Sequence, residues 1–336
     1  MLKTSDSPLS LRSVNTRLRK TLHYGDRPWF ILIGMAAVLI LILVLGIGWL
    51  LWTDSSLART AFGLNFFLPT SNASWNPVKD VYLSWPFIYG TLITSMVALI
   101  IALPVSLGIA IFLAELSPAW LRQPLGWTVE LLAAIPSVVY GLWGIFVFLP
   151  IIVVPVGNFL GLTLGQIPLL SIFFKGPIPA SGSSRLAAGL ILSIMITPTI
   201  AAVTRDVFMA IPQSQREASL ALGATRWETI SQVLLPYGLS GILGAVILGF
   251  GRALGETMAV TMVIGNSIEG SLSLLRPGYT MSSVVANEFA EAVNILHSQA
   301  LIYVGLILFV ITLLLNMVAR FLVWRVARKT PLEARA

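Results

Sequence analysis

The sequence contains no cysteine and only two histidines, His23 and His297, which lie far apart in the chain. A disulfide framework, a thiolate metal site and a cysteine nucleophile are therefore excluded, and the histidines form no local metal-binding pattern. Charge is scarce as well. Charged residues make up 10% of the 336 positions, against roughly 25% in an ordinary soluble domain, while 57% are hydrophobic. This composition excludes most metalloenzyme classes and indicates an integral membrane protein.

Long charge-free runs predict where the chain crosses the membrane. About 20 apolar helical residues span the hydrocarbon core, and a charge at its centre is costly. Six spans are predicted, which gives an all-α polytopic fold. They are residues 29–52, the run between Asp80 and Glu115, the start of the run from Leu131 to Phe174, and about 186–204, 237–265 and 299–322. The first is too long for the core of a signal peptide, so we interpret it as a retained helix.

The uncharged stretch from Leu131 to Phe174 is too long for a single span. We expect prolines and glycines to break up its second half. These residues are Pro150, Pro155, Gly157, Gly161, Gly165 and Pro168. We therefore expect residues 156–174 to form an outer or re-entrant segment and not a complete membrane crossing.

The excess of positive charge predicts the orientation of the chain. The formal net charge is +7, which in a soluble chain would raise the question of nucleic acid. With the amino terminus placed inside, 15 of the 21 Lys and Arg residues fall in inside segments and five in outside segments. The positive-inside rule explains this asymmetry. We therefore expect both termini in the cytoplasm and no nucleic-acid partner.

Five segments follow from these predictions. Residues 1–28 form a basic cytoplasmic tail, 29–52 the first membrane helix, 53–85 an extracytoplasmic loop, 86–325 the membrane core, and 326–336 a cytoplasmic tail. The core includes a cytoplasmic loop, residues 205–236.

The cytoplasmic loop has the pattern of two short helices. Ser214 with Glu217 predicts a capping box at the start of the first helix, and Gly223 supplies the left-handed position that ends it. Thr225 with Glu228 predicts a second capping box. Such a surface helix is suited to dock into a groove on another protein. Its available apolar side chains are Leu220, Leu222 and Trp227. The alternative is an amphipathic connector that lies on the membrane surface.

No nucleotide-binding loop is present in the sequence. The phosphate-cradling pattern GxxxxGK[ST] requires a lysine directly after a glycine, and none of the five lysines follows one. We expect the chain to bind no cofactor of its own and to hydrolyse no ATP alone.

Two charged residues lie within the predicted fifth span. Counted at about 1.5 Å per residue, Arg252 lies roughly 24 Å from Pro236, past the middle of the membrane, and Glu256 follows one helical turn later. An ionisable residue at this depth is a candidate functional site. In the functional interpretation, Arg252 binds an oxyanion through its planar, permanently charged guanidinium group, and Glu256 orients that guanidinium. The alternative is a buried ion pair that fixes helix packing.

Two glycines flank these charges. Gly251 and Gly255 form a small-xxx-small pair, which permits close contact with another helix. We expect this pair to bring the charged residues to a subunit interface.

The cytoplasmic loop resembles the EAA loop of ABC importer permeases. The resemblance rests on Glu217-Ala218-Ser219, Gly223 six positions after the glutamate, and Val233, Leu235 and Pro236, with Ser219 where alanine is usual and Val233 where isoleucine is usual. It implies a type I permease fold and a coupling helix that inserts into a cytosolic ATPase. The residues that would transmit ATP-driven motion are Glu217, Ala218, Leu222, Gly223, Ala224 and Trp227.

A second resemblance concerns the charged span. The stretch Gly251-Arg-Ala-Leu-Gly-Glu-Thr-Met-Ala-Val260, with Val263 to Asn266 and Ala286 to Glu291, is similar to the C-type permease of the phosphate-specific (Pst) ABC importer. The similarity covers nearly all of about 85–325, whereas residues 1–60 match only as a basic tail and a first helix. It implies that Arg252, Glu256 and Thr257 line the pathway of phosphate.

The same resemblance implies partners and a location. The partners are a second, A-type permease in a heterodimer, two copies of a cytosolic ATPase that hold ATP and Mg²⁺, and an extracytoplasmic phosphate-binding protein. The location is the inner (plasma) membrane of a prokaryotic cell, in contact with lipid.

Residues 266–298 form a predicted outer segment. Ser282 or Ser283 is positioned to cap a short helix that runs through Glu291. We expect this helix to close an outer gate or to receive the binding protein; the alternative is a solvated loop.

Other functions stay open at this point. Two alternatives belong to the same class of transporter: an A-type partner permease, or an importer of another oxyanion such as molybdate. The second stays open because a single arginine does not distinguish between tetrahedral anions. From a different class, a membrane-embedded enzyme or a receptor-like sensor would use Arg252 and Glu256 for catalysis or signalling. The lack of histidine, cysteine and paired carboxylates in the spans argues against an enzyme.

Overall fold

The computed structural model describes residues 26–67 and 75–327. Most of the two predicted cytoplasmic tails, residues 1–25 and 328–336, lies outside the described residues. Within the described ranges the chain is helical, without a named strand, which confirms the all-α prediction. The chain divides into two units, residues 1–53 and 54–336.

The first unit contains one long helix, α2 (Asp26–Asp54). Its uninterrupted apolar run between Arg27 and Asp54 leaves no charge to end the helix. The helix includes the first predicted span, and it is long and apolar enough to cross a membrane.

The second unit holds the remaining helices. These are α3 (Ser56–Phe62), α4 (Trp85–Ile111), α5 (Ala119–Ala133), α6 (Ser137–Trp143), α7 (Val154–Thr163), α8 (Ser171–Phe174), α9 (Arg185–Ala210), α10 (Gln213–Ala221), α11 (Arg226–Thr229), α12 (Leu235–Gly255), α13 (Met258–Val263), α14 (Met281–Glu288) and α15 (Ile295–Ala327). Wide π-helical segments cover Phe112–Leu116, Gly144–Val153 and Ile230–Leu234, and 3-10 turns cover Gly63–Phe67, Leu164–Gln166 and Phe289–Glu291. In the described part of the chain, six helical segments have the length and hydropathy of membrane spans, as predicted.

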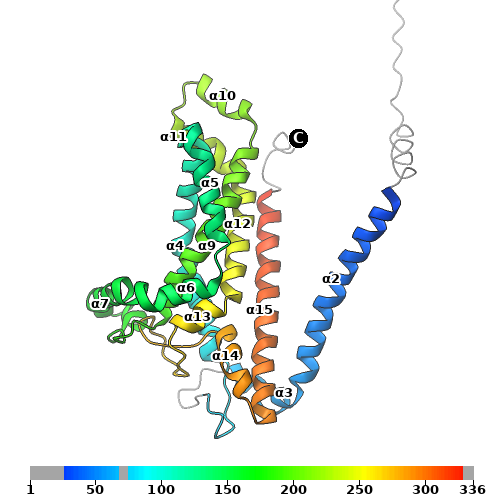
Figure 1. Ribbon diagram of the computed structural model, residues 1–336, viewed down its shortest axis with the longest axis vertical. Coiled ribbons are helices and arrows are strands. Elements are labelled where there is room, and N and C mark those ends of the chain that lie inside the picture. Colours follow the sequence, from blue (N-terminus) through cyan, green and yellow to red (C-terminus); the bar gives the residue numbers. More distant parts are fainter. Residues whose placement is uncertain (1–25, 68–74, 328–336) are drawn as a thin grey trace, which may run out of the picture. The chain divides into compact units, whose positions relative to one another are not determined.

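Helix α9 lies at the centre of the second unit. Figure 1 shows α4, α5, α9, α12 and α15 running along a common direction, with α10 at one end and α13 and α14 toward the other. Helix α9 packs against α4, α5 and α12, and it is far more buried than the other spans. Its residues Ile191, Met195 and Ile196 belong to the main hydrophobic core, together with Ala98 of α4 and Val260 of α13.

Polar side chains within α4 are satisfied locally. Thr91 and Thr94 donate hydrogen bonds from their hydroxyl groups to the carbonyls of Phe87 and Gly90, each 2.8 Å long. The hydroxyl of Ser106 donates to the Thr197 carbonyl of α9, at 3.0 Å. Because membrane interiors contain no water to bond these groups, local acceptors keep such residues compatible with a span.

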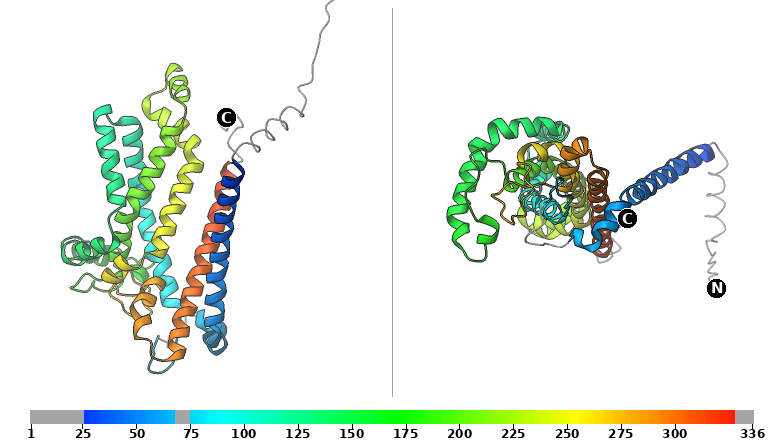
Figure 2. Two further views of the ribbon diagram at one scale, coloured as in Figure 1. Left: turned by 45° about the vertical axis from the view of Figure 1, so that its right-hand side comes forward. Right: turned by 90° about the horizontal axis from the view of Figure 1, so that it is seen from below.

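The third predicted span differs in the structure. Helix α5 begins at Ala119, the chain turns over residues 134–136, and one continuous helical segment then runs over residues 137–166. In Figures 1 and 2 this segment, from α6 to α7, runs across the common direction of the other helices.

The prediction that prolines and glycines break up this stretch is wrong for Pro150, Pro155, Gly157 and Gly161, which lie within the helical segment. It is confirmed at Gly165 and Pro168, where the helix ends. Pro150 lies inside the π-helical segment Gly144–Val153, and Pro155 lies in the first turn of α7. A π turn accommodates a missing i to i−4 hydrogen bond, and a proline in a first turn has no such bond to lose. The helix ends only near Gln166, so residues 156–166 are helical.

Candidate functional site

The intramembrane arginine lies in the last turn of α12. Arg252 is half-buried, and its Nη1 donates a hydrogen bond of 3.0 Å to the hydroxyl of Thr199 on α9. That bond uses one of five guanidinium donors, and no other hydrogen bond or ion pair of Arg252 occurs among the described residues. Arg252 therefore keeps donors available for an anion.

Thr199 was not predicted from the sequence as a site residue. It directly follows Pro198 within α9, and its side chain meets Arg252 only because α9 and α12 pack together. The one available signal was a hydroxyl beside a proline within a predicted span, which does not point to a partner 53 positions away.

Glu256 does not follow Arg252 on the same helix face, so this prediction is wrong, as is the continuous span to residue 265. Helix α12 ends at Gly255, and Glu256 is extended with φ −67° and ψ 129°. Its Oε1 accepts a hydrogen bond of 3.3 Å from the backbone N–H of Ala259, in the first turn of α13. The carboxylate thus serves the start of a new helix instead of extending the old one.

The break between α12 and α13 connects three helices. The hydroxyl of Thr257 donates to the carbonyl of Gly255 at 3.3 Å, and the hydroxyl of Ser282 on α14 donates to the carbonyl of Glu256 at 2.8 Å. Within the described ranges, no ion pair joins Arg252 to Glu256. The buried ion-pair interpretation is therefore wrong. The arrangement instead offers an open cationic group near a half-buried carboxylate and hydroxyl.

The glycines of α12 divide into two groups. A side chain at Gly238, Gly241 or Gly249 would meet residues of α9, such as Val207 and Ile200. In contrast, a Cβ built at Gly244, Gly251 or Gly255 would meet no atom of the described chain within 4 Å beyond its chain neighbours and the nearby backbone of its own helix. The second group leaves a narrow backbone surface uncovered by this chain, as expected if the Gly251 and Gly255 pair contacts another subunit.

The cytoplasmic loop contains the two predicted short helices, α10 and α11. Gly223 has φ +86°, and its N–H donates to the Leu220 carbonyl at 3.0 Å, while the Ala224 N–H donates to the Ser219 carbonyl at 3.2 Å. This is a Schellman motif. Both reciprocal bonds of the predicted capping box of Thr225 and Glu228 are present. These helix-end predictions are confirmed.

The predicted capping box of Ser214 and Glu217 is wrong. Helix α10 begins at Gln213, after Pro212, and its first turn has no side-chain cap. Pro212 takes φ −55° and ψ 137° and moves the helix start two residues earlier than Ser214 requires. Glu217 is therefore exposed, without a side-chain partner among the described residues.

The predicted coupling residues lie on the surface of the loop. Leu222 is 90% and Trp227 67% exposed. Glu217, Ala218 and Gly223 are also exposed, whereas Ala224 is half-buried. Large apolar side chains exposed on two short helices are typical of a surface that binds a partner.

Arg216 connects the loop to the membrane helices. Its Nε donates to Oε1 of Glu115 at 2.9 Å, and its Nη2 lies 2.8 Å from the same oxygen in an ion pair. Its Nη1 and Nη2 also donate to the carbonyls of Ile211 and Phe208, each at 2.6 Å. This side chain, which the sequence reasoning missed, joins α10 to the ends of α4 and α9. Arg216 therefore anchors the loop to both helices.

At the other end of the unit, the outer segments share a buried cluster. Trp75 Nε1 donates to Glu288 Oε2 at 2.6 Å, and the same oxygen lies 3.1 Å from Nε2 of His297. Tyr82 stacks on His297 with ring centroids 5.5 Å apart. Burial and, to a lesser extent, the Asp80 carboxylate raise the pKa of Tyr82 to about 12, so its phenol remains a donor to Asp80. The cluster joins the 75–84 loop to α14 and α15.

The predicted cap of the outer helix requires a correction. Thr280, and not Ser282 or Ser283, is the N-cap of α14, and Ser283 supplies the reciprocal bond of its capping box. The helix ends at Glu288, and a 3-10 turn covers Phe289–Glu291.

We predict that Glu288→Ala destabilises the outer segments. The change leaves the buried Trp75 N–H without its acceptor and His297 without its carboxylate, which costs about 2–3 kcal/mol. Thermal unfolding of the purified protein in detergent measures the effect. Glu291→Ala, at an exposed position three residues away, is the matched control. Equal midpoints for both variants would contradict the structural role of the cluster.

Arg185, the first residue of α9, is fully buried. Its Nη1 and Nη2 donate to the carbonyls of Ser273 and Glu269, each at 3.2 Å, and its guanidinium carbon lies 5.8 Å from the centre of the Tyr89 ring. Arg185 thereby holds the segment that leads to α14 against the start of α9.

The sequence matches known transport proteins over most of its length. The model of the binding-protein-dependent transport system inner membrane component family matches residues 106–330. The phosphate transport system permease protein PstC of Xylella fastidiosa (strain Temecula1) is 45% identical over 80% of this chain and 81% of its own length. The PstC proteins of Pasteurella multocida and Haemophilus influenzae are 47% and 43% identical, over 80% and 91% of this chain and 82% and 97% of their own lengths.

Solved structures share the fold. A chain of a bacterial alginate ABC transporter, in complex with its alginate-bound periplasmic protein, aligns with a TM-score of 0.59 at 16% identity, over 90% of this chain and 96% of its own. A chain of the MetNI methionine ABC transporter, in an inward-facing conformation, aligns with a TM-score of 0.51 at 18% identity, over 71% and 93%. At these identities the comparison establishes the fold, which is that of an ABC importer permease.

Proposed function

This chain belongs to the family of binding-protein-dependent transport system inner membrane components, and we propose that it is the C-type permease subunit of an ATP-driven phosphate importer. The observation that carries the proposal is the similarity to permeases named for phosphate transport, at 43–47% identity over 80% or more of the chain. The fold of ABC importer permeases supports it independently.

Arg252 is the anion contact in this proposal. Phosphate carries one to two negative charges near neutral pH, and a guanidinium is always charged and offers several fixed donors. Thr199 holds one Nη group and so orients the fork, while the other donors stay open. Thr257 and Glu256 lie at the break just beyond and line the same passage. The negative carboxylate would limit how tightly the anion is held, which favours its release.

Coupling to ATP takes place through the cytoplasmic loop. The exposed residues from Glu217 to Trp227 dock into a cytosolic ATPase that holds ATP and Mg²⁺, and closure of the ATPase dimer moves α10 and α11. The Arg216 and Glu115 contact passes this movement to α4 and α9. The passage then opens alternately to the two sides. The chain itself acts as a transport subunit and not as an enzyme.

The remaining partners complete the importer. A second permease covers the glycine surface of α12 that includes Gly251 and Gly255, and an extracytoplasmic phosphate-binding protein delivers phosphate to the outer segments around α14. This arrangement places the coupling loop and both termini in the cytoplasm of a prokaryotic cell, as the distribution of Lys and Arg favours.

Another oxyanion is the second candidate substrate, because one guanidinium does not distinguish phosphate from molybdate. The names of the relatives favour phosphate and the C-type subunit over the A-type.

Co-purification tests the assignment to an importer. We expect an affinity-tagged chain, extracted from its native membrane in mild detergent, to carry a cytosolic ATPase and a second permease in fixed stoichiometry. A membrane-embedded enzyme or a sensor would purify without an ATPase, and that result would contradict the proposal.

A further inference from the structure

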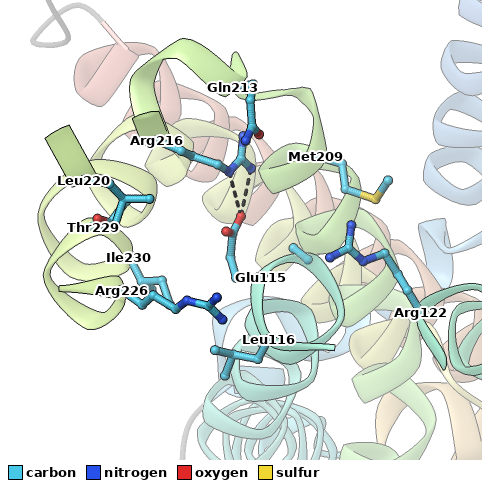
Figure 3. Close-up of a pocket in the computed structure, with 11 residues that line it drawn as sticks. Glu115, Leu116, Arg122, Met209, Gln213, Arg216, Leu220, Arg226, Thr229 and Ile230 are labelled. Carbon is cyan, nitrogen blue, oxygen red and sulfur yellow. Dashed lines mark hydrogen bonds and ion pairs between the residues drawn. The ribbon is translucent and has the colours of Figure 1, made fainter. Parts of the chain in front are cut away.

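A cavity of about 400 Å³ lies behind the coupling loop. It is open to one side and is lined by residues from the end of α4, the start of α5, the end of α9 and the helices α10 and α11 (Figure 3). Three of its lining residues are arginines, Arg122, Arg216 and Arg226, and the only carboxylate among the lining residues is Glu115. The lining therefore carries an excess of positive charge.

One of these arginines is already satisfied. Arg216 is bonded to Glu115 and to two backbone carbonyls, as described above. The Glu115 charge is therefore committed to Arg216, and the charges of the other two arginines remain uncompensated by it.

Arg122 and Arg226 lack partners suited to a guanidinium. The Nε of Arg122 is buried without a hydrogen-bond partner among the described residues, and its Nη2 reaches only the Ser117 carbonyl at 3.4 Å. Arg226 makes no side-chain bond within the same residues. In Figure 3 the two guanidinium groups point inward from opposite sides of the cavity. The buried, unpaired Nε of Arg122 is costly, whereas Arg226 is exposed and adds a second guanidinium to the same cavity, so this geometry favours an anionic acceptor between them.

The chemistry of that acceptor follows from the two forks. Guanidinium groups that approach from opposite sides need an anion with several oxygens around one centre, which a phosphate group offers and a carboxylate does not. The cavity is larger than a phosphate ion and leaves room for an ester substituent. Two sources are compatible with this position beside the cytoplasmic membrane surface: inorganic phosphate and the headgroup of an anionic phospholipid.

We propose that Arg122 and Arg226 form a second phosphate-group site, separate from the intramembrane Arg252. That this site faces the cytoplasm rests on the proposed function, whereas the binding of a phosphate group to it does not. A bound phosphate group would bridge α5 to α11, across the cavity from the Arg216 and Glu115 contact. It would thereby hold the coupling loop against the membrane helices and limit how far the loop moves with the ATPase.

Binding to the purified full-length chain in lipid nanodiscs tests the site. The cavity variant is Arg122→Gln/Arg226→Gln, and the matched control is Arg320→Gln/Arg325→Gln, which removes the same charge from exposed positions of α15. In the first arm, inorganic phosphate is titrated calorimetrically into neutral phosphatidylcholine nanodiscs. In the second arm, native mass spectrometry counts phosphatidylglycerol retained from mixed nanodiscs without free phosphate.

We expect the cavity variant to lose at least about tenfold in affinity, or to lose its retained lipid, in one of the two arms, because two charge-assisted contacts disappear. The arm that responds identifies the source of the phosphate group. The control and the wild type behave alike, and Arg252 is present in all three proteins, so the difference isolates the cavity. The single variant Arg226→Gln, at an exposed and unpaired position, repeats the test should the double variant fold poorly.

Equal binding by the wild type and the cavity variant in both arms would overturn the proposal. Equal loss in the cavity variant and the control would overturn it as well, because net charge alone would then explain binding. No transport is measured, so this failure would leave the proposed function intact, and a failure of uptake would leave the binding result intact.

Discussion

Arg252→Gln abolishes ATP-dependent phosphate uptake by the reconstituted importer while the complex still assembles. The change removes the permanent charge and most donors of Arg252, which makes a single hydrogen bond within the described residues. Loss of a charge-assisted, two-point contact costs about 3 kcal/mol, or roughly 100-fold in the rate of anion passage. Glutamine is shorter than arginine but remains polar, and Arg252 is only half-buried, so we expect helix packing to be preserved.

The measurement is uptake of labelled phosphate into vesicles, with co-purification of the ATPase as the test of assembly. Arg320→Gln, which removes the same charge from an exposed position, is the control and should transport normally. Thr199→Val should cause a smaller loss, because it frees the guanidinium without removing it. Uptake at the wild-type rate by Arg252→Gln would disprove the assignment of the anion contact.

The second large effect concerns the coupling loop. We expect Gly223→Val to uncouple ATP hydrolysis from uptake or to release the ATPase. No atom surrounds a Cβ at this position, but φ is +86°, where a β-branched residue is strongly disfavoured. The variant would therefore unwind the Schellman motif and misplace Leu222 and Trp227. Glu217→Gln should weaken the same contact without any change of fold, because its carboxylate is exposed and unpaired in the described chain.

Hydrolysis and uptake are measured together in the same vesicles, and the retained ATPase is quantified after purification. Ser214→Ala is the control, because it lies on α10 and caps nothing. Normal uptake with unchanged ATPase content in both loop variants would contradict a coupling role for this loop.

Features encoded by short-range patterns were predictable from the sequence. Charge-free runs located the spans, because a charge in the membrane core is costly whatever the tertiary fold. The left-handed Gly223 and the cap of Thr225 and Glu228 followed from residue spacing, because these bonds join neighbours in the chain. The predicted helix break at Pro150 is wrong because a π-helical segment accommodates this proline.

Features that depend on packing were not predictable. The helix break after Gly255 has only a single glycine as its local signal, and the placement of Glu256 depends on contacts with α13 and α14. Thr199 beside Arg252, Glu115 beside Arg216, and Glu288 beside His297 and Trp75 are brought together by helices that are distant in sequence. A single sequence contains no local signal for such pairs.

The most direct test of the central claim is anion uptake by the complete importer, with this chain, its partner permease, the ATPase and the binding protein in vesicles. Labelled phosphate is supplied with ATP, alone or with a large excess of sulfate or molybdate. We expect phosphate accumulation that requires ATP and withstands both competitors. Accumulation of molybdate or sulfate in place of phosphate, or phosphate entry without ATP, would contradict it.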